Sequence, residues 1–416
     1  MIDLSPLRES RSYRLLWIGQ LVSLTGTQLR LVAIPYQVYV LTGSSFDVGL
    51  IGLFQAVPFI ALALFGGAVA DRFDRRRLLL ITQVGLGLCS AALAIGTQAG
   101  IASVPFLYAI TAVGACFSAI DGPARGSLTP NLVERRQLAA AISLNQVIFQ
   151  VGAIAGPAVA GYVILAFGLA GAYWIDVATF AVALSTVAAM SVPASEARVH
   201  PPILRAVGEG LAYLRANRIL LATFVLDFLA TFFGSPRALF PFYADRVFAV
   251  GPQGLGLLFA APGIGSLTAA LGSGWIPRVS RQGVRLLSAV AAWGVAIVAF
   301  GLMRDGLFVL ALLSIAFAEG ADTVSAILRH TILQTLVPDE LRGRILSIAQ
   351  IFFLGGPYLG QVESGIVAEA FSPEFAVISG GVATIASVGL VALWAPELIS
   401  YRAPAPDRLE SPSRGA

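Results

Sequence analysis

Long apolar blocks separated by short charged segments dominate this chain of 416 residues. The blocks run for roughly 18–25 residues, the length that an α-helix needs to cross a hydrocarbon core about 30 Å thick. Inside lipid every backbone N–H and C=O group needs a partner within the protein, so each block is expected to be a helix. Composition agrees, because 57% of the residues are hydrophobic and only 12% are charged, far less charge than a soluble domain carries. The sequence therefore predicts an all-α membrane protein.

Twelve membrane spans are predicted, and their ranges are 14–41, 46–70, 78–97, 104–126, 139–165, 170–190, 219–243, 254–275, 286–303, 307–328, 345–368 and 375–396. The basic side chains, all of them arginines, test this count. If the N-terminus is cytoplasmic, the external loops contain only Arg246 and Arg304, and the other loop and terminal arginines face the cytoplasm. This distribution follows the positive-inside rule. We expect a multi-pass protein of the cell membrane with both termini in the cytoplasm.

The longest cytoplasmic connection divides the chain into two halves that resemble each other. Gly156-Pro157 matches Gly356-Pro357, and Ile34-Pro35-Tyr36 matches Phe240-Pro241-Phe242. An offset of about 200–208 residues relates these pairs, which indicates parallel repeats of the kind that rock around a midplane site in transporters. The predicted organisation is a six-helix bundle over 1–190, a cytoplasmic linker with an amphipathic helix over 191–218, a second six-helix bundle over 219–400 and a disordered cytoplasmic tail over 401–416.

The segment 67–77, between the second and third predicted spans, reads Gly-Ala-Val-Ala-Asp-Arg-Phe-Asp-Arg-Arg-Arg. Five of its positions match the signature loop of the major facilitator superfamily, which the segment resembles: Gly67, Asp71, Arg72, Arg75 and Arg76. Asp74 stands where that family usually has glycine. The resemblance implies a cytoplasmic gate, in which Asp71 meets a helix N-terminus of the other half and the arginines bridge to carboxylates or helix-end carbonyls. The alternative is a basic anchor that only fixes orientation.

A second pattern of small residues occurs in the fifth predicted span and is echoed in the eleventh. Its positions are Gly152, Gly156, Pro157 and Gly161, with Gly356, Pro357 and Gly360 in the second half. It resembles the motif that, within the superfamily, accompanies exporters that exchange substrate for protons. Small residues let helices approach closely, and proline bends them. Ala160 replaces a glycine of the family pattern, and ordinary helix packing is the alternative role.

Over nearly its whole length the chain is similar to the branch of this superfamily that contains the enterobactin exporter and macrolide-efflux proteins. The resemblance lies in Trp17-Ile-Gly-Gln-Leu-Val-Ser, in Pro35-Tyr-Gln-Val-Tyr-Val-Leu-Thr-Gly-Ser-Ser, and in Leu333-Gln-Thr-Leu-Val-Pro-Asp-Glu-Leu-Arg-Gly-Arg344. It implies the major facilitator fold, with twelve transmembrane helices in two pseudo-symmetric six-helix bundles. These stretches do not specify the substrate.

Ionisable side chains inside the predicted spans are candidates for substrate binding or proton coupling, because an unpaired charge in a bilayer is costly. They are Arg30, Asp176, Asp227, Glu319, Asp322 and Glu363. Glu319 and Asp322 share a helix face, and two close carboxylates resist double ionisation, so one is expected to retain a proton. Arg30 can alternate between a carboxylate and an anionic substrate group. The alternative is a permanent buried ion pair that orders the bundle.

Other function classes find little support in the sequence. His200 and His330 lie far apart, and the chain has no phosphate-binding loop with Gly-Lys-Ser/Thr, so neither an enzyme nor an ATP-driven pump is expected. We expect no metal, no cofactor and no nucleic acid. The predicted partners are a small-molecule substrate, protons as coupling ion and the lipid bilayer, with the chain acting as a monomer.

The predicted function is a secondary active transporter, a proton-coupled exporter (antiporter) of a small amphipathic or anionic molecule such as a siderophore or a drug. Alternating access would move the substrate. A facilitator, an importer or a lipid flippase remain alternatives within transport. A membrane receptor that binds its ligand without moving it is the alternative from another class.

Overall fold

The computed structural model describes residues 3–72, 74–191 and 203–402, and these residues form helices and turns without a strand. Within that part of the chain, nine helices are long and apolar enough to cross a membrane. One of them, Arg135–Ala188, covers the fifth predicted span and all but the last two residues of the sixth. The all-α membrane fold is thus confirmed, whereas the count of twelve spans stays a prediction.

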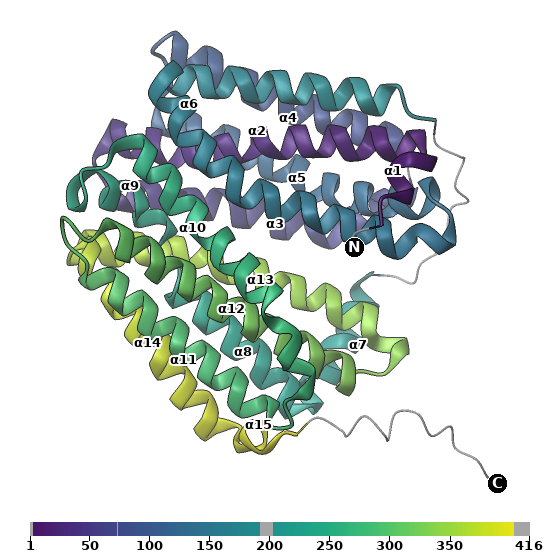
Figure 1. Cartoon of the computed structure of the whole chain (residues 1–416), viewed down its shortest axis with the longest axis vertical. Helices are drawn as coiled ribbons and strands as arrows, with labels where there is room; N and C mark the ends of the chain where they lie inside the picture. Colours follow the sequence, from purple (N-terminus) through teal and green to yellow (C-terminus); the bar gives the residue numbers. More distant parts are fainter. Residues whose placement is uncertain (1–2, 73, 192–202, 403–416) are drawn as a thin grey trace.

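The first half of the chain forms the upper group of helices in Figure 1. Its helices are α1 (Ser5–Glu9), α2 (Arg11–Thr42), α3 (Ser45–Arg72), α4 (Arg75–Gln98), α5 (Val104–Leu132) and α6 (Leu138–Ala188), with a 3-10 turn at Arg135–Gln137. The long α6 consists of two legs that meet at Gly168, where φ is 69°. Only glycine adopts this left-handed backbone without strain, so Gly168 marks the turn between the two predicted spans.

The second half forms the lower group in Figure 1. Its helices are α7 (Ile203–Ala216), α8 (Arg218–Phe233), α9 (Phe240–Phe242), α10 (Gly251–Leu271), α11 (Gln282–Leu302), α12 (Phe308–Leu336), α13 (Asp339–Ala370), α14 (Pro373–Trp394) and α15 (Pro396–Ser400). Shorter turns lie at Arg237–Leu239, Tyr243–Val247 and Ser273–Arg278. The seventh predicted span, 219–243, is therefore not one helix, because it is interrupted between Phe233 and Arg237.

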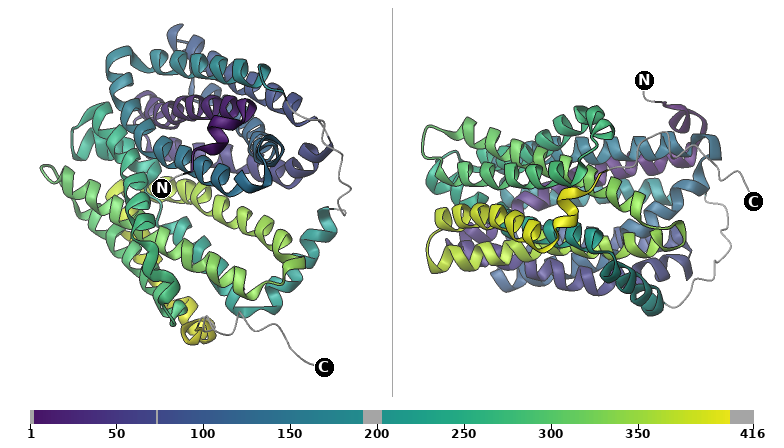
Figure 2. Two further views of the ribbon diagram at one scale, coloured as in Figure 1. Left: turned by 45° about the vertical axis from the view of Figure 1, so that its right-hand side comes forward. Right: turned by 90° about the horizontal axis from the view of Figure 1, so that it is seen from below.

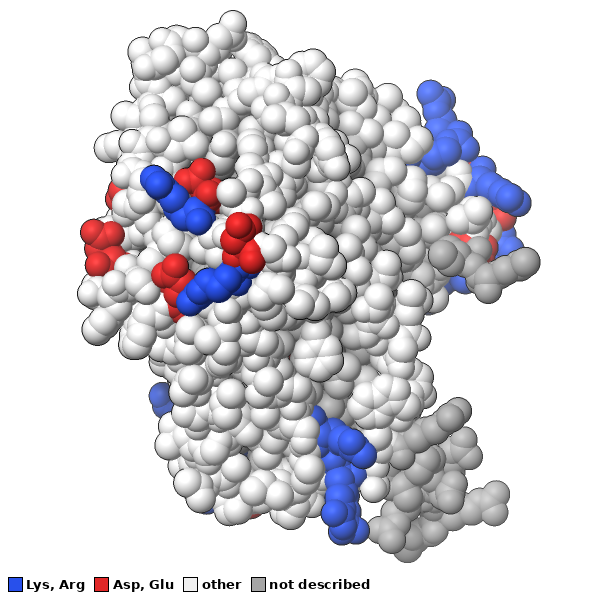
Figure 3. All heavy atoms as spheres, turned by 60° about the vertical axis from the view of Figure 1, so that its left-hand side comes forward, with Lys and Arg blue, Asp and Glu red and all other residues white. Residues whose placement is uncertain are grey.

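Both chain termini lie at the same end of the molecule (Figure 2), which we call the termini end, and the opposite end is the far end. On the face drawn in Figure 3, charged side chains gather toward the two ends and leave a broad uncharged band between them. Large apolar side chains such as Leu313, Phe317 and Leu393 are more than half exposed. Such a band is what a protein surrounded by lipid requires.

The two halves share one apolar core toward the far end and have separate cores at the termini end. The shared core joins residues such as Leu29 and Tyr173 of the first half to Leu239 and Phe300 of the second. At the termini end, one cluster around Tyr13 belongs to the first half and another, around Phe224, belongs to the second. Across the halves α3 packs on α13 and α6 packs on α10. The halves are thus joined mainly toward the far end.

The predicted amphipathic helix of the linker corresponds to α7. It packs against α13 and α8 and also touches α3 of the first half. Leu214 is buried, the hydroxyl of Tyr213 donates to the carbonyl of Leu336, and Arg344 of α13 pairs with Glu209. The helix therefore belongs structurally to the termini end of the second half. Residues 192–202 of the predicted linker (191–218) and residues 403–416 of the predicted tail (401–416) lie outside the described residues.

Candidate transport site

A cavity of about 350 Å³ lies between the two halves, and we call it the central cavity. Helices α2, α3, α4, α5, α10 and α13 contribute to its wall. Most lining groups are apolar or aromatic, among them Phe59, Phe259 and Tyr358. Two cations line it as well, Arg30 from the first half and Arg237 from the second. An apolar wall with a few convergent polar groups is typical of a small-molecule site.

Arg30 is held by an acidic partner within its own half. Its Nη1 atom lies 3.9 Å from Oδ2 of Asp176 and donates a hydrogen bond of 3.2 Å to the hydroxyl of Ser90. Ser90 in turn donates to Asp176 over 2.6 Å. Asp176 is fully buried, whereas 13% of the Arg30 side chain is exposed. Since Arg30 faces the cavity and Asp176 lies behind it, a ligand can reach the cation but not the acid.

Arg237 has the corresponding place in the second half. The helix α8 ends at Phe233, and Gly234 and Pro236 precede the short turn that begins with Arg237. Its Nη2 atom lies 3.3 Å from Oε1 of Glu319 on α12. The two side chains are 40% and 30% exposed, so this pair is accessible. Backbone that departs from a helix at membrane depth is found where it lines a cavity, as it does here.

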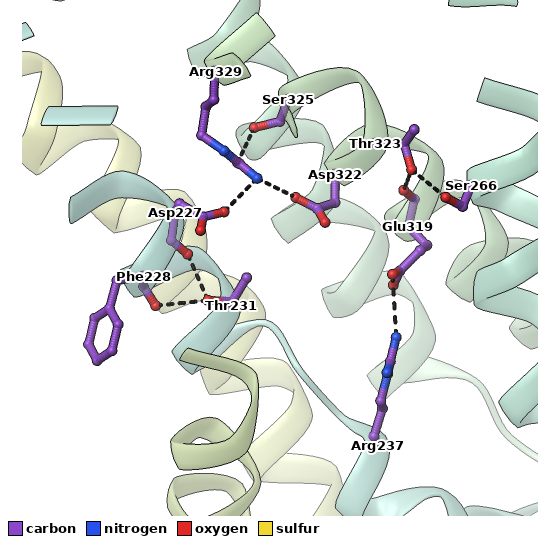
Figure 4. Close-up of polar contacts among 10 residues, drawn as sticks. All are labelled: Asp227, Phe228, Thr231, Arg237, Ser266, Glu319, Asp322, Thr323, Ser325 and Arg329. Carbon is purple, nitrogen blue, oxygen red and sulfur yellow. Dashed lines mark hydrogen bonds and ion pairs between the residues drawn. The ribbon is translucent and has the colours of Figure 1, made fainter. Parts of the chain in front are cut away.

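A buried cation, Arg329, lies between two acids (Figure 4). Its Nη2 atom is 2.6 Å from Oδ1 of Asp227 on α8 and 3.4 Å from Oδ1 of Asp322 on its own helix. Its Nη1 atom donates to the hydroxyl of Ser325, and the guanidinium packs on the ring of Phe353. Asp227 is 1% exposed and Asp322 23% exposed. Asp227 is thus the fixed partner and Asp322 the accessible one.

We call these five residues the second-half cluster: Asp227, Arg237, Glu319, Asp322 and Arg329. Glu319 and Asp322 do share a helix face, and both line a cleft of about 820 Å³ together with Thr323 and His330. Each acid, however, pairs with a different arginine, Glu319 with Arg237 and Asp322 with Arg329. The cluster is therefore an ion pair and a triad, each with members on α12, rather than two carboxylates that share one proton.

The first half contains a polar cavity of its own, of about 300 Å³, which we call the first-half cavity. Arg30 lines it, as do Asp121 and Arg125 of α5. Asp121 pairs with Arg125 over 3.1 Å and accepts hydrogen bonds from Thr82 and Gln83. This i,i+4 pair thus lies beside the candidate site.

Glu363 lines none of the cavities described above, and neither do the buried acids Asp176 and Asp227. It is half-buried on α13, two residues beyond Gln361, which does line the central cavity. Within the described residues it has no hydrogen bond or ion pair. The structure therefore brings Arg30 and Asp176 together in the first half and Asp227, Glu319 and Asp322 together in the second, and it leaves Glu363 apart from both groups.

The signature segment 67–77 spans the junction of α3 and α4 at the termini end. Arg75 donates to the carbonyl of Ser127 over 3.0 Å, and Arg76 donates to the carbonyl of Val187 over 3.2 Å. Asp74 accepts from the backbone N–H of Arg77 and caps α4, which gives its departure from glycine a physical reason. Gly67 and the side chains of Asp71 and Arg72 lie outside the residues described in atomic detail.

The small-residue pattern of α6 faces two neighbours. Gly152 and Gly156 pack against Leu24 and Gln28 of α2, whereas Pro157 and Gly161 contact Gly256 and Pro252 of α10 in the other half. In α13, Gly356 and Gly360 pack against Thr231 and Phe232 of α8, and Pro357 lines the central cavity. In both halves the pattern allows close helix packing, and in α6 it also forms part of the contact between the halves.

Two arginines of this site are absent from the predicted set. Arg329 lies one residue beyond the predicted tenth span, 307–328, but α12 continues to Leu336. Arg237 precedes Phe240-Pro241-Phe242 as Arg30 precedes Ile34-Pro35-Tyr36, so the internal repeat is the signal that points to it.

Two helical halves that are joined toward one end and enclose a charged cavity define a secondary transporter of the membrane. The comparisons with known proteins assign the family. The family model described as "Transmembrane secretion effector" matches residues 2–407. The chain therefore belongs to this family of the major facilitator superfamily, and it is a transporter rather than an enzyme.

Its relatives include the enterobactin exporter EntS of Escherichia coli (strain SMS-3-5 / SECEC), which is 26% identical over 416 residues, with 99% of each chain covered. The enterobactin exporter EntS of Shigella boydii serotype 18 matches with the same identity and coverage. The chain spans nearly the whole length of both proteins.

Solved transporter structures share the fold. A bacterial homologue of the human lysosomal transporter Spinster, in an inward-facing and unoccupied conformation, has a TM-score of 0.69 at 17% identity and covers 95% of this chain and 99% of its own. A D-xylose-proton symporter has a TM-score of 0.69 at 17% identity, with 93% and 98% covered. At these identities the likeness supports the fold alone.

Proposed function

We propose that this protein is a proton-coupled exporter of a small amphipathic or anionic molecule that works by alternating access. Both termini face the cytoplasm, as the arginine distribution favours, so the termini end opens inward. The halves 1–190 and 219–400 then move as two bodies, while the linker 191–218 and the tail 401–416 stay cytoplasmic. The chain acts as a monomer in the cell membrane, and its relatives that export enterobactin support the outward direction.

The substrate binds in the central cavity. Arg30 and Arg237 reach this cavity from opposite halves, and among the described residues each has one acidic partner, at 3.9 Å and 3.3 Å. An anionic group of the substrate can therefore approach either cation from the cavity, and the fully buried Asp176 keeps its pairing with Arg30. The aromatic walls formed by Phe59, Phe259 and Tyr358 suit a ligand with apolar or aromatic parts.

The charge count in the second-half cluster carries the proposal of proton coupling. Three carboxylates (Asp227, Glu319 and Asp322) face two arginines. An uncompensated carboxylate at membrane depth is costly, so binding one proton makes the cluster neutral. Asp322 is the group that binds this proton in the proposal, because it lies farther from Arg329 than Asp227 does and is more exposed. The cleft that it lines gives water a route to it.

The remaining motifs have mechanical roles in this proposal. The segment 67–77 holds the cytoplasmic end closed in the outward-facing state, with Asp71 and Arg72 bridging to the second half. The glycines of α6 and α13 keep the helices close enough to tilt against each other. Two events then alternate in the cycle. Asp322 releases its proton toward the cytoplasm, and the substrate binds at Arg30 and Arg237.

The test begins with the substrate. Enterobactin, a macrolide and phospholipids are screened for thermal stabilisation of the purified protein, since a ligand of the folded state raises the melting temperature. The compound that stabilises it is used in proteoliposomes, where gradient-driven transport is compared with counterflow, the exchange of labelled for unlabelled substrate without net proton movement. Transport that is unchanged after the proton gradient collapses would reject coupling.

Asp322→Asn separates a proton carrier from a structural residue. We expect it to lose gradient-driven transport while counterflow persists, because substrate binding and rocking remain intact. Asp305→Asn, in the loop between α11 and α12, is the matched control and should leave both activities unchanged. Full gradient-driven transport by Asp322→Asn would remove Asp322 as the carrier, and loss of both activities would assign it a structural role.

A further inference from the structure

An apolar groove of about 830 Å³ lies on the second half, away from the central cavity, and we call it the lateral groove. Helices α10, α11 and α12 form it. Small residues form its floor where α10 and α12 meet: a Cβ atom added to Gly265 would lie only 1.7 Å from the carbonyl oxygen of Ala316. Large side chains on its rim stand out, with Phe317 62% and Leu313 59% exposed. The groove is therefore a depression in the lipid-facing surface.

One cation lines this mainly apolar groove. Arg285 lies in the first turn of α11, at the termini end, and Trp275 lies nearby on the turn that precedes α11. Among the described residues, no hydrogen bond or ion pair involves the guanidinium of Arg285. Tryptophan and arginine together at the end of a spanning helix are typical of the headgroup level of a bilayer. The groove thus combines a free positive charge at the interface with an apolar channel below it.

We propose that the lateral groove binds one anionic phospholipid, with its phosphate at Arg285 and one acyl chain along α12. Charge complementarity selects the headgroup, since a zwitterionic lipid satisfies the phosphate contact but adds a positive charge next to Arg285. The groove follows α12 from Val324 to Leu313, which at 1.5 Å per residue is about 16 Å. This length matches one leaflet, half of a hydrocarbon core about 30 Å thick.

The site differs from ordinary lipid contact in its shape and its charge. Most of a lipid-facing helix surface is convex and uncharged, and lipids exchange on it without preference. Here the small residues Gly320 and Ala321 between the exposed rims let an acyl chain lie below the surrounding surface, where more of its area contacts protein. Juxtamembrane arginines favour anionic lipid by an amount that corresponds to about fivefold per charge.

Native mass spectrometry of the purified protein, titrated with phosphatidylglycerol or phosphatidylcholine of identical acyl chains, tests the proposal. The wild type should bind one phosphatidylglycerol about fivefold more tightly than phosphatidylcholine. Arg285→Gln should abolish this preference. Arg281→Gln, which removes another exposed arginine directly before α11, should retain it. Equal binding of both lipids to the wild type would overturn the proposal.

The acyl-chain part is tested separately by filling the groove from α11. Ala289 lines the groove, whereas Val284 on the same helix does not. Ala289→Phe should remove the tightly bound lipid, and Val284→Phe should not, although both add the same ring to the surface of α11. If both or neither variant loses the lipid, the groove is not the binding site. Melting temperatures of all variants confirm that the fold is retained.

Discussion

The contact between α3 and α13 near the far end should control which way the transporter opens. Gly52 of α3 lies so close to α13 that an added Cβ atom would sit 2.3 Å from the carbonyl oxygen of Tyr358, where ordinary contacts are 3.4–4 Å. Gly52→Ala therefore requires the two backbones to separate by about 1 Å at this point. The far end is closed in this structure, so the substitution strains the state that is observed.

The size of the effect follows from the cost of overpacking a tight contact, about 1–3 kcal/mol. The strain exists only while the far end is closed, because α3 and α13 separate there when it opens. The equilibrium should consequently shift by about 5–150-fold toward the far-end-open state. The gain in helix propensity of alanine over glycine, about 1 kcal/mol, applies to both states and cancels.

Distances between spin labels at the termini end measure this shift. Ser143 near the start of α6 and Gln334 near the end of α12 are exposed, and the native cysteines Cys89 and Cys116 are first replaced by alanine. In a rocking transporter the termini end closes when the far end opens. Gly52→Ala should therefore move much of the distance distribution to shorter values.

Gly355→Ala on α13 provides the control, since its added Cβ atom would find its nearest neighbour at an ordinary 3.7 Å. It should give the wild-type distribution. The reasoning is refuted if Gly52→Ala also gives the wild-type distribution, or if both variants shift it equally. A shift toward longer distances would mean that the contact does not hold the far end closed.

Two further predictions concern stability in detergent. Asp74→Ala removes the side chain that accepts from the N–H of Arg77 and should lower the free energy of unfolding by about 1 kcal/mol; Asp74→Asn, which retains the cap, should be nearly neutral in the same thermal melts. Asp227→Ala leaves the buried Arg329 without its 2.6 Å partner and should cost about 3–5 kcal/mol. Asp245→Ala, which breaks the exposed pair with Arg246, should cost at most about 1 kcal/mol, and equal losses in the two variants would contradict the burial argument.

Hydropathy predicted the membrane helices well but not their ends. Contact with lipid requires apolar side chains, so hydropathy marks only the part of a helix that lies in the bilayer. The helix itself continues as long as its backbone hydrogen bonds do. The predicted fourth and tenth spans end at residues 126 and 328, yet α5 continues to Leu132 and α12 to Leu336. Arg329 is therefore outside the apolar block but only 5% exposed, because acids of α8 and α12 surround it.

Which charged groups pair depends on how the helices pack, and residue spacing along one helix does not predict it. Glu319 and Asp322 are three residues apart on one face, which correctly indicates that both reach the same cleft. Which cation each acid meets depends on α8, whose end at Phe233 redirects the chain so that Arg237 reaches Glu319. Gly234 and Pro236 indicate that the helix ends here, but the packing of the surrounding helices determines the direction in which the chain continues.

The duplicated halves have arginines at corresponding positions, but their acidic residues differ. Helices α5 and α12 are both 29 residues long, and Arg125 and Arg329 occupy the same position within them. Arg125 pairs with Asp121 on its own helix, and Arg30 pairs with Asp176, so these first-half clusters have one acid for each cation.

The second-half cluster has three acids for two cations. Its excess negative charge cannot be balanced by the first-half clusters, whose cations already have partners. Under the proposed mechanism, this imbalance assigns proton binding to the second half, whereas Arg30 and Arg237 let both halves bind the substrate. Coupling then requires no direct contact between proton and substrate. A change of charge at Asp322 alters its attraction to Arg329 and thereby the position of α8. Arg237 follows the end of α8 and lines the cavity, so it moves with that helix.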